Sequence, residues 1–187
     1  MATSETAICN DALVEMGAAR IASLTEDSAT ARIMREQYSI IRDELLAGHP
    51  WNFSLKRANL AASTTAPVNK YAYKYAKPGD CLRVLEMYEG EEIDWQEEGE
   101  YIVTDSSSMS ILYISRITET GKYPPHFSRA LALKLAANTC YAIVQSVSLK
   151  DSLEKKAEAM LAQARSFDAQ VGAPRQPYAR TWLNSRY

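Results

Sequence analysis

Apolar side chains recur at a helical spacing near both ends of this chain and at a spacing of two in its middle. Met34, Tyr38 and Ile41 follow one another at the interval of a single helix face. Tyr73 and Tyr75 instead alternate with smaller or polar residues, which is the period of one face of a strand. Because the pattern changes twice, the chain must combine helices with strands that lie between them in sequence.

Four long segments without an internal glycine or proline show the helical period: residues 3–16, 27–47, 127–147 and 148–171. The third segment is apolar nearly all round, with Lys134 as its only charge after Arg129, which is typical of a helix in the middle of a bundle. The fourth opens on Ser148 and Asp151, the spacing of a capping box.

The central part of the chain predicts five or six short strands in a small antiparallel sheet or sandwich. Residues 110–115 are expected to pair with one of two shorter pieces, 93–95 or 101–103, across a turn at 105–108. The remaining strands are expected around Trp51–Leu55, Tyr71–Tyr75 and Leu82–Tyr88.

The expected fold class is therefore α+β and mainly α: a four-helix bundle with an inserted small antiparallel β domain and an extended C-terminal tail. Residues 1–50 and 123–172 would form the helical bundle, residues 51–122 the β insertion and residues 173–187 the tail. Two prolines and a preceding glycine make the tail extended rather than helical.

The tail combines three arginines with large apolar and aromatic residues, which are the residue types that anchor protein interfaces. It contains no acid. The alternative is a tail that packs back on its own domain. The residues predicted to bind a partner are Arg175, Tyr178, Arg180, Trp182, Leu183, Arg186 and Tyr187.

Charge is unevenly distributed, although the net charge is only −2. Residues 86–105 hold nine acids and no lysine or arginine. Such a block is either a solvated hairpin tip that discourages edge pairing or a surface that repels a polyanion or meets a basic partner. Its densest part consists of Glu91, Glu92, Asp94, Glu97, Glu98 and Glu100.

Motifs for catalysis, metals and cofactors are absent from the sequence. Its two histidines and three cysteines show no zinc-ligand spacing, and neither a phosphate-binding glycine loop nor a GxSxG sequence occurs. The acidic block could supply an acid/base pair or calcium ligands, but its residues lack the calcium-loop pattern and are expected to be solvated. We expect no enzyme activity, no cofactor and no metal.

The sequence also predicts a protein that folds in a reducing cytoplasm. Its cysteines are few and widely spaced, and its first residues lack the basic and apolar regions of a signal peptide. The apolar stretch 130–147 carries Lys134, so it predicts a buried helix and no membrane segment.

Several segments resemble phage head-to-tail connector adaptors, the tail tubular protein A or gatekeeper-like family of short-tailed phages. The specific part is residues 49–57, with Trp51 and Phe53, followed by a tyrosine-rich strand at 71–75 and the sequence Lys-Pro-Gly-Asp-Cys-Leu-Arg at 77–83. Adaptors of long-tailed phages share the helical bundle, so the resemblance leaves the tail type open.

This resemblance implies a structural virion protein without catalytic residues, made in the cytoplasm of a bacterial host. Twelve copies would form a ring beneath the portal protein ring and extend the DNA channel to the tail nozzle or tail fibre proteins. The C-terminal extension would dock on the portal. Genome DNA would pass during ejection without sequence-specific binding, and the acids of residues 86–105 would line the channel or its rim, because basic contacts would hold phosphates.

Two other functions stay open at this stage. The chain could be a tail-associated peptidoglycan hydrolase that uses the acids of the β insertion, in which case Glu97 or a neighbour would be essential. It could also be a small helical protein-interaction module, which would never form rings.

Overall fold

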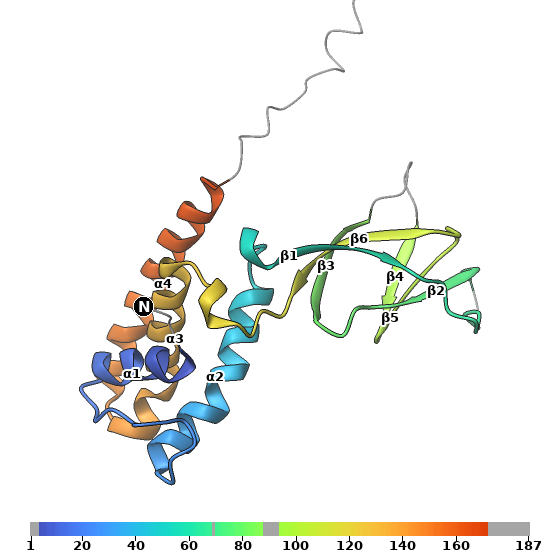
Figure 1. The fold of residues 1–187 in the computed structure, drawn as a ribbon. Helices are drawn as coiled ribbons and strands as arrows, with labels where there is room; N and C mark the ends of the chain where they lie inside the picture. The colour runs from blue at the N-terminus through green and yellow to red at the C-terminus, as the bar shows by residue number, and fades with distance from the viewer. Residues whose placement is uncertain (1–3, 69, 88–93, 172–187) are drawn as a thin grey trace, which may run out of the picture.

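The computed structural model describes residues 4–68, 70–87 and 94–171, and it places the helices on one side of the molecule and the strands on the other (Figure 1). The helices are α1 (Glu5–Glu15), α2 (Ala29–Ala47), α3 (Pro125–Val144) and α4 (Val147–Ala169), with short 3-10 helices at Asn52–Ser54 and Thr120–Lys122. The strands are β1 (Leu55–Leu60), β2 (Tyr73–Ala76), β3 (Cys81–Met87), β4 (Trp95–Glu98), β5 (Tyr101–Thr104) and β6 (Met109–Ser115).

Serine side chains cap three of the helices at their N-termini. Ser4, Ser28 and Ser146 each accept a hydrogen bond from a backbone N–H three residues further on. The capping box predicted at Ser148 is wrong by two residues, because α4 already begins at Val147 with Ser146 as its cap. Gly17 follows α1 with φ 70°, a conformation that glycine adopts without steric cost.

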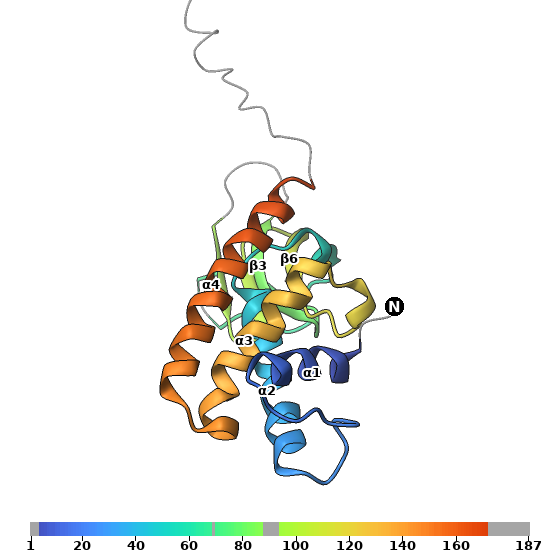
Figure 2. The same ribbon diagram turned by 90° about the vertical axis from the view of Figure 1, so that its left-hand side faces the viewer.

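Helix α3 is the centre of the helical part. It packs against each of the other three helices, and Figure 2 shows it between α4 and α2 with α1 across the front. Alanines on several of its faces, including Ala130, Ala132 and Ala136, are fully or almost fully buried and allow close approach of the neighbouring helices. Gln145, in the left-handed conformation, then reverses the chain into α4.

The expected fold class is wrong, because these helices do not form a simple four-helix bundle. In such a bundle each helix packs along two neighbours. Here α4 packs along α3 and has at most marginal contact with α1 and α2, which in turn touch each other little. The fold is mixed α+β, about 49% helical, with two three-stranded antiparallel sheets.

The two sheets have the strand orders β1-β6-β3 and β2-β5-β4, and all their pairings are antiparallel. Their facing side chains form a second buried cluster, separate from the helical core. This cluster contains Tyr75 and Ile102 from one sheet and Val84, Ile111 and Tyr113 from the other. Burial of apolar surface between the sheets therefore stabilises both of them.

Two strand predictions need correction. Residues 110–115 were expected to pair across the 105–108 turn, but β6 pairs with β1 and β3, so that turn crosses from one sheet to the other. The Asp105 carboxylate accepts the Ala72 N–H and the Ser106 carbonyl accepts the Tyr75 hydroxyl, which holds the turn against β2. The alternation at Trp51 and Phe53 forms a 3-10 turn, and β1 starts only at Leu55.

A small set of polar contacts joins the strands of the first sheet to the segments that lead into β1 and β3. The buried Ser115 hydroxyl donates to the Ser54 carbonyl at 2.8 Å. Lys56 Nζ lies 2.6 Å from one Asp80 oxygen, and the Tyr113 hydroxyl donates to the other at 3.1 Å. These contacts hold residues that are distant in sequence next to one another. The predicted division into domains at residues 51, 123 and 173 stays a prediction.

Candidate functional site

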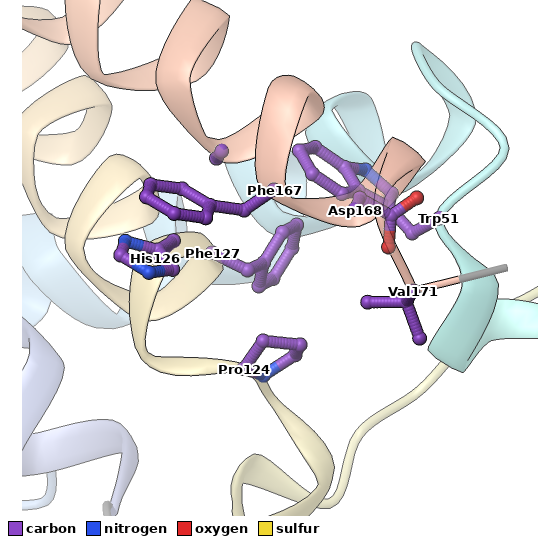
Figure 3. A pocket seen from close by; sticks show the side chains of 8 residues that line it. Trp51, Pro124, His126, Phe127, Phe167, Asp168 and Val171 are labelled. Atoms are coloured by element: carbon purple, nitrogen blue, oxygen red, sulfur yellow. The ribbon is translucent and has the colours of Figure 1, made fainter.

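The last turns of α4 border a hollow at the molecular surface with a volume of about 250 Å³ (Figure 3). This is slightly below the roughly 300–1,000 Å³ of sites that bind drug-sized molecules, so its size suits a single side chain. Most of its lining is apolar or aromatic: Trp51, Pro124, His126, Phe127, Phe167 and Val171.

Aromatic packing at the start of α3 forms the inner side of the hollow. Trp51 is only 2% exposed, and its indole N–H donates to the Leu45 carbonyl at 2.9 Å. Its ring meets Phe127 edge-on at a centroid distance of 5.1 Å, and Phe127 meets Phe53 and Tyr123 in the same way. Edge-to-face rings fix one another's orientation, so this side of the hollow is rigid.

Helix α4 forms the outer side. Ala164, Phe167, Asp168 and Val171 lie on one helix face, because they are spaced by three or four residues. Phe167 stacks on His126 with the ring centroids 3.9 Å apart, yet it is 47% exposed, and Val171 is 74% exposed. Helix α4 packs against the first turn of α3, and its apolar face continues past that turn. Part of this face is therefore left exposed.

Asp168 attaches the end of α4 to the segment after α2. Its carboxylate accepts the Asn52 backbone N–H at 3.1 Å, and the Asn52 side-chain amide donates to the Asp168 carbonyl at 2.6 Å. His49 Nε2 lies 3.5 Å from the same carboxylate. A buried carboxylate is stabilised by such contacts, so Asp168 is a positioning residue for the hollow.

The pKa of His49 is lowered, because burial disfavours its charged form more than the neighbouring Asp168 favours it, while Arg165 lowers it further. The unfolded chain therefore binds a proton at a pH where folded His49 stays neutral. We expect the free energy of unfolding to fall as the pH drops through about 6.5 and to level off below the folded pKa.

Urea unfolding of the wild type and of His49→Gln between pH 5.5 and 7.5 measures this effect. His49→Gln should remove part of the slope of unfolding free energy against pH, and His126→Gln, the change at the other histidine, is the matched control. An unchanged slope in His49→Gln would contradict the expectation.

The described acids of the predicted channel-lining set lie just before β4, on β4 and on the turn after it, and all four are exposed. Lysines from the other side of β5 neutralise two of them: Lys70 lies 3.2 Å from Asp94, and Lys77 lies 3.0 Å from Glu97. Glu98 and Glu100 complete the described set, while Glu91 and Glu92 lie outside the described residues. The acidic block of the sequence is thus partly compensated in space.

The predicted partner-binding residues, Arg175 to Tyr187, also lie outside the described residues. The last described residue, Val171, lines the hollow, so this segment begins at the hollow. The pattern alone did not predict the hollow. The sequence feature that could have indicated it is the apolar face of residues 148–171. This face extends to Phe167 and Val171, past the N-terminal end of α3, against which α4 packs.

Within residues 4–68, 70–87 and 94–171, no group of three or more histidine, cysteine or acidic side chains is placed to hold a metal ion. In the same ranges, no helix is both long and apolar enough to span a membrane.

Comparison of the chain with known proteins gives no match, either to a protein-family model or to a curated protein.

Proposed function

We propose that this chain is a structural virion protein, a head-to-tail adaptor that forms a ring beneath the portal, extends the DNA channel and joins it to the tail. The proposal rests on the sequence resemblance and on how two of its specific segments, residues 49–57 and 77–83, are related in space. Lys56 of the first segment and Asp80 of the second form an ion pair of 2.6 Å, although 24 residues separate them.

Residues of the same two segments also make contacts that join the helices to one another and stabilise the first sheet. Trp51 lies in the helical core and Asn52 attaches the end of α4, whereas Asp80 binds Tyr113 in the first sheet. The specific part of the resemblance therefore includes residues whose contacts join the helices and the first sheet. That supports the proposed adaptor function.

The exposed acids and the exposed apolar side chains agree with a subunit of a ring that surrounds a DNA channel. The exposed acids on and beside β4 would repel phosphates along a channel, even with two of them paired to lysines. A ring subunit needs exposed apolar contacts on its sides, and Ile40 and Tyr141 are 60% and 59% exposed on α2 and α3.

Native mass spectrometry of the full chain mixed with the portal ring of the same phage tests the proposal. We expect one complete ring of this chain on each portal ring. Trp182→Ala should weaken attachment about 30-fold or more, since truncation of an aromatic anchor costs about 2 kcal/mol or more. Val68→Ala, at a fully exposed loop position, is the control and should bind normally. Absence of any binding by the full chain would overturn the adaptor function.

A further inference from the structure

The hollow beside α4 leaves apolar surface uncovered at the point where the described chain ends. Phe167 and Val171 stand at its edge, and Trp51 and Phe127 lie deeper (Figure 3). Exposed apolar area of this kind is unfavourable in water, so a covering group would stabilise the molecule.

We propose that the hollow binds Tyr178 of the chain's own C-terminal segment, residues 172–187. This inference does not depend on the proposed function. It assigns the segment a binding site on the same molecule, occupied when no other partner holds the segment.

Chain length permits this docking. Ala164 lies about 10 Å along α4 from Val171, because a helix rises about 1.5 Å per residue. Gly172 and Pro174 favour a reversal of the chain. Four extended residues after that reversal span about 13 Å, which brings Tyr178 alongside the hollow.

The chemistry of the segment also matches the site. A tyrosine presents an apolar ring to the aromatic inner side and can keep its hydroxyl at the edge of the hollow, on the side of Asp168. The segment carries three arginines and no acid. The C-terminal end of α4 carries the partial negative charge of the helix dipole together with the Asp168 carboxylate, so it favours a basic segment.

Covalent attachment favours the chain's own segment over that of a second copy. A short linker gives an effective concentration in the millimolar range, above the concentration of free chains in dilute solution. Docking of a second copy's segment would instead depend on protein concentration.

Limited trypsin digestion of the full chain tests this inference. Trypsin cleaves after Arg175 and Arg180, which flank Tyr178, and the rates follow the population of undocked segment. Phe167→Ser removes one side of the hollow and should accelerate both cleavages about tenfold. Val147→Ser, also an exposed apolar position but at the other end of α4, should leave them unchanged.

Tyr178→Ser is the second variant, because it changes none of the residues that line the hollow. Its cleavage rate, normalised to that of the matching free peptide, should rise by a similar factor. Equal rates in wild type and both test variants would overturn the inference. Protection that increases with protein concentration would overturn it as well, because it would assign the hollow to the segment of a second copy.

Discussion

Replacing Trp51 with alanine is expected to lower the free energy of unfolding by about 3–5 kcal/mol, the range for loss of a large buried aromatic side chain. Trp51 is almost completely buried, donates its indole N–H to the Leu45 carbonyl and packs edge-on against Phe127. Its removal leaves a cavity between α2, α3 and α4 and an unpaired buried carbonyl. Equilibrium urea denaturation, followed by circular dichroism, measures the change.

The matched control is Trp95→Ala, because Trp95 lies on the edge strand β4 and is only partly buried. Trp95→Ala should lower the free energy of unfolding clearly less than Trp51→Ala does. Trp51→Phe keeps most of the ring packing but loses the hydrogen bond to Leu45, so it should fall between wild type and Trp51→Ala. A loss below about 1 kcal/mol for Trp51→Ala would show that this tryptophan does not join the helices.

Replacing Tyr75 with alanine is expected to lower the free energy of unfolding by about 3 kcal/mol or more, because packing between the two sheets is lost. The Tyr75 ring is fully buried between them, and its hydroxyl donates to the Ser106 carbonyl at 2.8 Å. The change removes packing from both sheets and a hydrogen bond from the turn that connects them. Urea denaturation again measures the loss.

Tyr73→Ala provides the comparison within the same strand. Tyr73 lies on β2 as well but is 36% exposed, so its removal should cost about 1 kcal/mol or less. Equal losses for the two tyrosines would contradict the placement of Tyr75 in the core between the sheets.

The positions of the helices could be predicted from the sequence because local physics determines them. Ser28 at the start of α2 and Gly48 at its end are signals that act within a few residues. The same holds for Gly17 after α1. The buried positions Met34, Tyr38 and Ile41 of α2 likewise follow from its period.

The packing of the helices could not be predicted in this way. An apolar helix such as α3 is compatible with any arrangement that surrounds it, and the four-helix bundle was only one of these. Which helix faces which depends on contacts between residues far apart, such as Arg129 with Glu15 and Asn52 with Asp168. A single sequence does not encode these pairings in its spacing.

Strand pairing was mispredicted for a similar reason. A short turn between two alternating runs favours a hairpin, and residues 105–108 have that composition. Hydrogen bonds from the turn to β2 and the burial of β6 between β1 and β3 outweigh this local preference.

The partial compensation of the acidic block could not be predicted either. The lysines that pair with two of its acids lie shortly before and directly after β2, outside the block of residues in which the charges were counted.

One feature of the fold determines how the molecule would carry mechanical load. Strand β1 leaves the helices and β6 returns to them, side by side and with Leu55 opposite Ile114. A force that separates the sheets from the helices pulls both strands in the same direction and divides between them. The hydrogen bonds that join β1 and β6 are then not sheared against one another, and two covalent strands transmit tension across the joint.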